Sequence, residues 1–373
     1  MGTMKITLDR LTLSFMIVIV VIITTITLTL THYGHIPKTT HQNLLPHHSS
    51  TPSDHASHTN TVEYTHSNHA AATLDTTAAG MTHVSDEKIT LTTAAISHLP
   101  VHGFTPGLGH AGHITVNSSV YEAPFDLWVT GKTFNVTNAD FYNLHHANLF
   151  RPDLRSRTCE GIYWRDMLSI GSDTMYQNAF NLPDGYAVFV PAGSPLQLDV
   201  MFHNPETENA QDLYNVQGSI DLKLAAPDQI SDIKIAEYIR LELTDSPCLG
   251  DNKSFVFTVP ANTEEYIIGQ EYSAKDPFVH TFTQSGKIIY AGGHVHGWEG
   301  GQKLDIFLND RIIIDYQTKK VSDHPFKYKT AHRPESINVK AGDVLRLEAT
   351  YTNPSNNPIP GAMGMFGMFF AAD

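Results

Sequence analysis

From about residue 89 onward, the sequence is a series of short apolar runs separated by Gly, Pro, Asn and Asp. In the run 344–351, Leu345 and Leu347 alternate with Arg346 and Glu348, so we expect the leucines to face inward and the charges to face water. No long amphipathic helix interrupts the series, which predicts an all-β body. Nine runs have the length and composition of β-strands: 188–193, 196–202, 219–225, 239–244, 254–259, 287–293, 303–308, 311–316 and 344–351.

The folded body has about 285 residues, more than one β-sandwich of ordinary size requires. The stretch 224–232 (LAAPDQISD) is rich in turn-forming residues and offers a seam between two parts. We therefore predict two tandem β-sandwich domains, at residues 89–232 and 233–373.

The N-terminal region contains an apolar run at residues 11–31 without a charged residue, and about 20 such residues can cross a bilayer as a helix. Lys5 and Arg10 precede the run and the next basic residue is Lys38, which favours a cytoplasmic N-terminus. We therefore predict that residues 1–31 are a cytoplasmic tip and a transmembrane signal anchor. The protein would then be a single-pass protein of the cell membrane, with its C-terminal body outside the cytoplasm. A cleaved signal peptide is the alternative, although the apolar core is long and no A-x-A site follows it.

Residues 32–88 are rich in Thr, Ser, His, Asn and Ala and have little aliphatic periodicity. Such a segment buries too little apolar surface to offset the entropy of ordering it, which predicts a disordered tether. Ten histidines fall in this segment. Two interpretations stay open for them, a polar spacer or a loose, exchangeable collector of metal ions.

Charge and cysteine content exclude several classes of protein. The chain has 24 Lys and Arg against 38 Asp and Glu, a formal charge of −14, and no basic cluster, which argues against a nucleic-acid partner. Cys159 and Cys248 are the two cysteines, too few for a disulfide-rich scaffold or a CxxC site. The sequence does not determine whether they pair.

Two histidine pairs stand out in the body: His145 and His146 in LHHANLF, and His294 and His296 in AGGHVHG. An H-x-H on a strand places both imidazoles on one face, about 6–7 Å apart at the backbone, where they can share a metal. Adjacent histidines point to opposite faces, so both reach one ion only where the strand bends or ends. Each pair needs at least one further ligand.

Candidate third ligands follow two other runs. His203 ends the run 196–202 and could complete the first pair. Met363, Met365 and Met368 lie in the C-terminal PGAMGMFGMFFAAD. Two imidazoles and a thioether suit Cu(I), whereas three imidazoles suit copper or zinc. The alternatives are core packing for the methionines and ordinary core or surface positions for the histidines. Three lone histidines are expected at the surface or as groups that orient ligands: His280, His324 and His332.

The order of these motifs resembles the type II copper monooxygenases, the family of peptidylglycine α-hydroxylating and dopamine β-monooxygenases, and most closely their SURNod19-like microbial and plant relatives. The resemblance covers residues from about 120 to 373. It depends on these segments in sequence: WVTG, LHHANLF, LPDGYAVFVPAG, LQLDVMFHN, AGGHVHG, DHPF, HRPESI, KAGDVLRLEATY and AMGMF.

The resemblance implies two tandem antiparallel, jelly-roll-like β-sandwiches that each lend one copper site to a cleft between them. It implies an enzyme that hydroxylates a C–H bond of a small substrate with O2, two copper ions and an external electron donor such as ascorbate. The electron-donating copper would be bound by His145, His146 and His203. The O2-binding copper, the catalytic set, would be bound by His294, His296 and Met363, with Met365 as the alternative to the methionine.

One departure from the family bears on the substrate. Peptide-amidating members have an arginine two residues before the H-x-H that grips a substrate carboxylate, and Gly292 stands there in this chain. This argues against a glycine-extended peptide as substrate. Two other classes of function stay open: a non-catalytic copper-binding or copper-delivery protein, and a structural or adhesive protein whose histidines bind no metal.

Overall fold

The computed structural model of the chain describes residues 74–75, 80–102, 114–154, 165–171, 179–206, 209–244, 257–320, 328–329 and 331–373. The chain divides into two compact units, Met1–Ser57 and His58–Asp373, and all described residues lie in the second. The predicted anchor at 11–31, Cys159 and Cys248 lie outside the described residues. In the described part of the chain, no helix has the length and hydropathy that crossing a bilayer requires.

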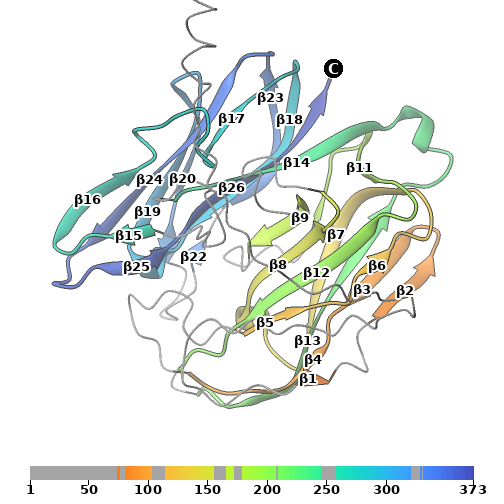
Figure 1. Ribbon diagram of the computed structural model, residues 1–373, viewed down its shortest axis with the longest axis horizontal. Helices are drawn as coiled ribbons and strands as arrows, with labels where there is room; N and C mark the ends of the chain where they lie inside the picture. Colours follow the sequence, from red (N-terminus) through yellow and green to blue (C-terminus); the bar gives the residue numbers. More distant parts are fainter. Residues whose placement is uncertain are drawn as a thin grey trace, which may run out of the picture. The chain divides into compact units, whose positions relative to one another are not determined.

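The described residues form an all-β structure with three short 3₁₀ helices, which confirms the predicted class (Figure 1). The 3₁₀ helices are η2 (Phe141–Asn143), η3 (Ile230–Asp232) and η4 (Gly297–Glu299). The strands before η3 are β1 (Leu74–Asp75), β2 (Gly80–Ser85), β3 (Lys88–Thr92), β4 (Ala95–Leu99), β5 (Ile114–Asn117), β6 (Tyr121–Glu122), β7 (Leu127–Thr137), β8 (Leu144–Arg151), β9 (Arg165–Gly171), β10 (Ala179–Asn181), β11 (Tyr186–Val190), β12 (Pro195–Phe202) and β13 (Leu213–Leu224).

The strands after η3 complete the described structure. Each of the nine predicted runs overlaps a strand. They are β14 (Lys234–Glu242), β15 (Phe257–Val259), β16 (Thr263–Ile268), β17 (Val279–Thr281), β18 (Gly286–Val295), β19 (Gly301–Leu308), β20 (Arg311–Gln317), β21 (Lys319–Lys320), β22 (Tyr328–Lys329), β23 (Ala331–Val339), β24 (Val344–Asn353), β25 (Ile359–Ala362) and β26 (Gly364–Ala372).

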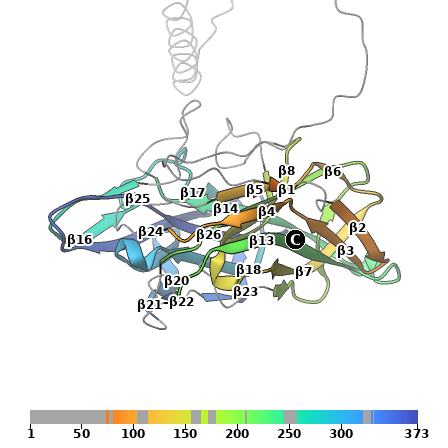
Figure 2. The same cartoon turned by 90° about the horizontal axis from the view of Figure 1, so that it is seen from below.

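The largest sheet runs through both halves of the described chain. Its strand order is β1-β4-β13-β7-β11-β14-β26-β18-β23, with β10, β2 and β3 paired alongside (Figures 1 and 2). The two halves meet where β11 pairs with β14 in parallel, Tyr186 opposite Lys234 and Ala187 opposite Ile235. All other strand pairs among the described residues are antiparallel.

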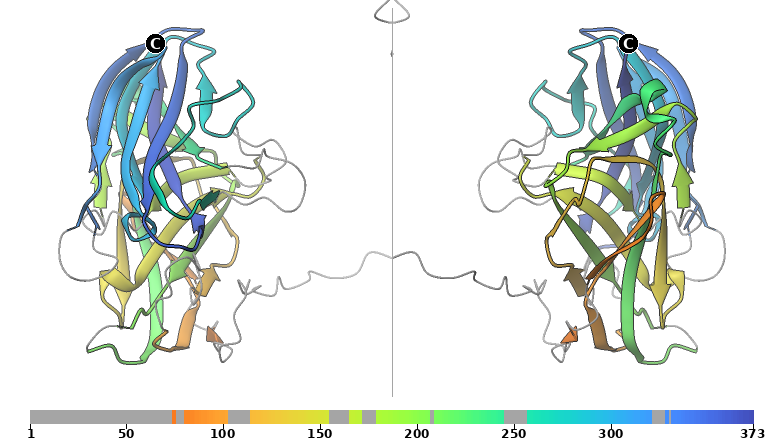
Figure 3. Two further views of the ribbon diagram at one scale, coloured as in Figure 1. Left: turned by 90° about the vertical axis from the view of Figure 1, so that its left-hand side faces the viewer. Right: turned by 90° about the vertical axis from the view of Figure 1, so that its right-hand side faces the viewer.

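Two five-stranded sheets accompany the large one, β5-β12-β8-β9 with β6, and β16-β24-β19-β20 with β17. Figure 3 shows the same ribbon from two sides, with the strands of the C-terminal half in teal to blue. Two-stranded pairs are β15 with β25 and β21 with β22. The buried apolar side chains form two clusters. The first cluster draws mainly on strands β3 to β13 and the second mainly on β14 to β26.

The strands β26 and β18 are buried on both faces, which explains their nearly continuous apolar sequence. Tyr290 and Phe369 belong to the first apolar cluster, whereas Ala291 and Met368 on the opposite face belong to the second. Side chains on the first face therefore point toward strands of the N-terminal half. This places the β18 histidines within reach of β8.

Two details differ from the sequence predictions. The tether was predicted to end at residue 88, but β2 already pairs with β3 because the Asp86–Glu87 turn closes a hairpin on the buried Ile89 and Leu91. The two domain boundaries stay predictions.

The second difference concerns Arg346, which was expected to face water but is buried, with 6% of its surface exposed. Its guanidinium lies over the rings of Tyr272 (4.7 Å) and Phe307 (4.2 Å), donates to the Gly269 carbonyl oxygen at 3.0 Å and pairs with Glu348. These contacts replace water around the charge. Gly269 and Tyr272 belong to the segment after β16, whose position the alternation in β24 does not reveal.

Candidate metal centre

A β-bulge in β8 places His145 and His146 side by side. In the pairing with β12, Met201 lies opposite His146 but Phe202 lies opposite Leu144, so His145 is the extra residue. A bulge of this kind breaks the alternation of the strand and redirects a side chain. The two imidazole centroids are 4.0 Å apart, and both rings are buried. The bulge supplies the bend that an adjacent histidine pair needs to face one ion.

His203 follows the last residue of β12 and is 2% exposed. Its backbone N–H donates to the Asn143 carbonyl (2.8 Å), and the Asn143 amide donates back to the His203 carbonyl (3.1 Å). Its Nε2 lies 2.7 Å from the Tyr142 carbonyl oxygen. Because a carbonyl only accepts, Nε2 is the protonated nitrogen in this arrangement. The His203 ring centroid is 5.4 Å from that of His145.

His294 and His296 lie at the end of β18, on the face that belongs to the first apolar cluster. Met365 of β26 lies directly opposite His294, so these two side chains share that face. The His296 N–H donates to the Met363 carbonyl (3.2 Å), which also accepts from the Tyr351 hydroxyl (2.5 Å). The two imidazoles are 2% and 0% exposed, and their centroids are 5.5 Å apart.

The five predicted histidines form one buried group, which we call the histidine cluster: His145, His146, His203, His294 and His296. Ring centroids of His145 and His296 are 5.3 Å apart, and those of His146 and His294 are 6.2 Å apart. Segments about 150 residues apart in sequence therefore meet here.

Three histidines of this cluster present the most compact set of donor atoms. One ring nitrogen from each of His145, His146 and His296 lies within 4.8 Å of the others. This set takes two residues from the first predicted triad and one from the second, so the observed grouping differs from the predicted one. The reason is the bulge together with the orientation of β18, which bring the two pairs against each other.

The three C-terminal methionines divide between the two faces of β26. Met365 shares the face of His294, and Met363 lies immediately before the strand, at the backbone contact with His296. Met368 lies opposite Ala291 and packs in the second apolar cluster, which fits the core-packing interpretation for that residue.

Two residues at the cluster were missed in the sequence. Glu299, in η4, is 2% exposed and its Oε2 lies 2.7 Å from Nδ1 of His296. Trp298 stacks on the His296 ring, with centroids 4.3 Å apart. The signal for Glu299 was available, because an acid three residues after a ligand in a tight turn can reach back to it.

His102 was also missed. It is 7% exposed, accepts a hydrogen bond from the Asn204 N–H at Nε2 (3.2 Å), and its ring centroid is 6.5 Å from that of His203. An isolated bridge between His102 and Pro205 fixes its position. No motif in the sequence distinguishes this single histidine from its neighbours.

Among the three lone histidines, the described structure gives the side-chain surroundings of His280 alone. His280 packs edge-on against Phe282 (4.8 Å between centroids). The backbone of His332, in β23, pairs with Gly292 of β18, and His324 lies outside the described residues.

The donor set of the cluster fits a borderline or soft transition metal. Imidazole nitrogens suit copper and zinc, and Glu299 holds His296 so that Nε2 is the nitrogen available to a metal. All five histidines are at most 7% exposed, so bulk water has little access to the cluster.

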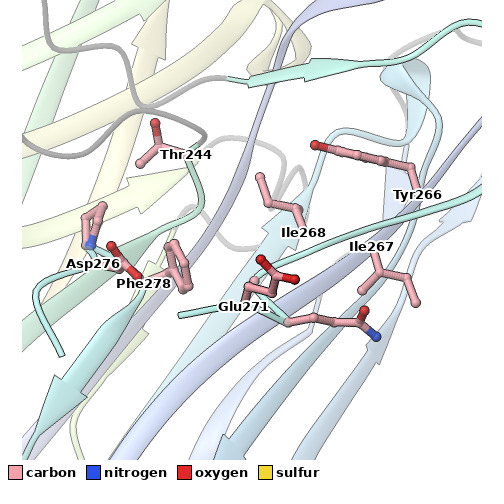
Figure 4. A pocket seen from close by; sticks show the side chains of 10 residues that line it. Thr244, Tyr266, Ile267, Ile268, Glu271, Asp276 and Phe278 are labelled. Carbon is pink, nitrogen blue, oxygen red and sulfur yellow. The ribbon is translucent and has the colours of Figure 1, made fainter. Parts of the chain in front are cut away.

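Away from the cluster, a cavity of about 470 Å³ opens between β16 and the segment that leads into β17 (Figure 4). Ile268, Phe278 and Tyr266 line it, and the carboxylates of Glu271 and Asp276 lie beside them. None of the predicted ligands lines this cavity.

Comparison with known proteins gives no family. No family model matches the chain, and no curated protein matches it. Solved structures with a low-scoring likeness include a recombinant peptide:N-glycanase F (10% identity, TM-score 0.33, covering 73% of this chain and 94% of that one) and a peptide-N(4)-(N-acetyl-β-D-glucosaminyl) asparagine amidase (10%, 0.32, 73% and 95%). The major capsid protein P2 of bacteriophage PM2 is a third (8%, 0.30, 74% and 97%). At these identities and scores, the likeness carries no inference about function.

Proposed function

We propose that this protein is a copper-dependent monooxygenase that hydroxylates a C–H bond of a small substrate with O2 and an external electron donor such as ascorbate. One observation carries the proposal: five histidines from three separate strand ends converge in a single buried cluster. Imidazole nitrogens gathered at one buried point form a donor set for a transition metal, and copper is the metal that imidazole and thioether donors together favour.

The proposed ligands are the six named from the sequence. The first set is His145, His146 and His203, and the second is His294, His296 and Met363. Met365 is the alternative thioether because it lies opposite His294 on the same face of the sheet. Two such sets in one cluster would keep the two ions close together.

Copper bound in this donor set would supply one-electron redox chemistry and activation of O2. The residues of the chain have other tasks. Glu299 fixes the tautomer and orientation of His296, the bulge in β8 aims two imidazoles at one point, and the burial of all five rings keeps bulk water away from them. Gly292, two residues before His294, offers no side chain to grip a substrate carboxylate, so the substrate class proposed here is not an acidic peptide terminus.

The proposal also includes the division of the body into two domains and its attachment to the membrane. The two apolar clusters correspond to the cores of two tandem β-sandwiches, and residues 11–31 anchor the body at the outer face of the cell membrane. The accompanying partners are O2, a small molecule and the membrane, without nucleic acid.

The test is copper analysis and O2 uptake with the full chain. Copper-loaded protein should bind two ions per chain and consume O2 when ascorbate is supplied. The matched variant His294→Ala/His296→Ala should lose both properties, and His280→Ala, outside the cluster, should retain them. Uptake that is equal in the double variant would contradict the proposal.

A second candidate is a non-catalytic copper-binding or copper-delivery protein. The specific observation in its favour is that every ring of the cluster is at most 7% exposed, which leaves little room for substrate beside the metal. Tight Cu(I) binding without O2 uptake, with any reductant, would favour this second function.

A further inference from the structure

The most compact donor set in the histidine cluster combines the two sets inferred from the sequence. One ring nitrogen from each of His145, His146 and His296 lies within 4.8 Å of the others, and the exposed fractions of these residues are 0%, 7% and 0%. His145 and His146 belong to β8 in the sheet β5-β12-β8-β9, whereas His296 directly follows β18 of the largest sheet.

We propose that the tightest metal ion of this protein is bound by His145, His146 and His296 together, as a copper or zinc site shared between two sheets. The proposal rests on the proposed function for the presence of a metal, but it assigns the ion to a triad of different membership. His203, His294 and Met363 then remain for a second, weaker ion.

The distances allow such a site. Metal–imidazole bonds of about 2.0–2.1 Å require ligand nitrogens no more than about 4.2 Å apart. Nitrogens within 4.8 Å reach that range when the rings turn by a small angle about their side-chain torsions. Three imidazoles complete the usual protein share of a four-coordinate site and leave one position for an exogenous ligand.

The positions of the donor atoms favour His296 over His203 as the third ligand, because the set of ring nitrogens within 4.8 Å includes His296 and not His203. The Glu299 carboxylate takes Nδ1 of His296, so its Nε2 can bind the ion. Nε2 of His203 donates to the Tyr142 carbonyl (2.7 Å), which leaves its Nδ1 for a metal, so hydrogen bonding permits either residue and the donor positions decide between them. The ring centroid of His145 is nearly equally far from those of His296 (5.3 Å) and His203 (5.4 Å), so the centroid distances alone do not separate the two.

A shared ion would also link the two sheets. The metal would stabilise contact between β8 and the end of β18, because binding to the folded state alone shifts the folding equilibrium toward it. The loaded protein should therefore resist thermal unfolding more than the metal-free protein does.

The experiment is an anaerobic Cu(I) titration of the full chain against a competing chelator. We expect His145→Ala, His146→Ala and His296→Ala each to weaken the tightest binding more than about 100-fold, beyond the range typical of outer partners. His203→Ala and Met363→Ile should change it less than tenfold. The reverse pattern, in which His203→Ala removes the tightest ion and His296→Ala retains it, would overturn the mixed triad. Circular dichroism of each metal-free variant checks that it is folded.

A measurement on the wild-type protein tests the same proposal if some variants do not fold. X-ray absorption at one equivalent of Cu(I) should show nitrogen scatterers alone, and a sulfur scatterer would contradict the all-histidine site. Copper binding with a sulfur shell leaves the proposed function standing and removes only this inference. Failure of the wild-type chain to bind copper or zinc would remove both.

Discussion

Glu299 Oε2 lies 2.7 Å from Nδ1 of His296, and these two side chains are 2% and 0% exposed. They are three residues apart across the turn η4, so the contact is built locally by the sequence HGWE. A buried carboxylate on one imidazole nitrogen selects the tautomer whose other nitrogen can bind a metal. The turn η4 therefore determines which nitrogen of His296 faces a metal in the cluster.

Replacement of Glu299 by Gln should weaken copper binding by about 10–100-fold, because an amide orients the imidazole less firmly than a carboxylate does. The control is Glu264→Gln, an exposed position on β16. Competition titrations of both variants measure the effect. Equal affinities in Glu299→Gln and wild type would show that the contact does not support the metal site.

Gly300, which follows Glu299, should not tolerate a side chain. Its φ is +86°, and an added Cβ would lie 2.0 Å from the Thr352 carbonyl oxygen. Gly300→Ala should therefore lower the free energy of unfolding by at least about 1–3 kcal/mol. Gly342→Ala is the matched control, since its φ is +90° with no atom within 4 Å of the added Cβ. Similar losses in urea denaturation of the two variants would show that the contact with Thr352 contributes nothing.

The sequence reveals the strands and the histidine pairs because both depend on local pattern. Alternation at Leu345 and Leu347 identifies a buried strand face, and H-x-H fixes two imidazoles on one side of a strand. The bulge at His145 depends instead on the register of β8 against β12, which is a contact between segments distant in sequence. The parallel pairing of β11 with β14, which carries one sheet through both halves, is equally non-local.

The membership of the metal sets was not predictable for the same reason. His203 ends a strand beside β8, as expected, but the distance from β8 to His296 depends on which face of β18 is turned toward the N-terminal half. Because β18 is buried on both faces, its sequence shows no alternation of apolar and polar residues that would reveal this orientation.

The choice between the two methionines is tested by Met363→Ile and Met365→Ile. Isoleucine retains the apolar volume, so both variants should fold, whereas the thioether is lost. We expect Met363→Ile to lower Cu(I) binding at the second, weaker site and Met365→Ile to retain it. Loss in Met365→Ile alone would move the ligand by two residues, to the position opposite His294.

Tyr290 should make the free energy of unfolding depend on pH in the alkaline range. Burial raises its pKa from 10.0 to about 12, so the folded state retains a proton that the unfolded state releases. The free energy of unfolding is unaffected by this group below pH 10, and it falls by roughly 2–3 kcal/mol as the pH rises from 10 to 12. Tyr290→Phe should flatten the decline of the unfolding free energy between pH 10 and 12. Tyr214→Phe, at a position 58% exposed, is the control, and identical slopes in Tyr290→Phe and wild type would contradict the prediction.

The most direct test of the account is a crystal structure of the copper-loaded chain, with anomalous diffraction measured on both sides of the copper absorption edge. The account predicts a copper peak among the rings of His145, His146 and His296. An anomalous map without a peak in the histidine cluster, from protein shown to be folded and exposed to excess copper, would contradict it.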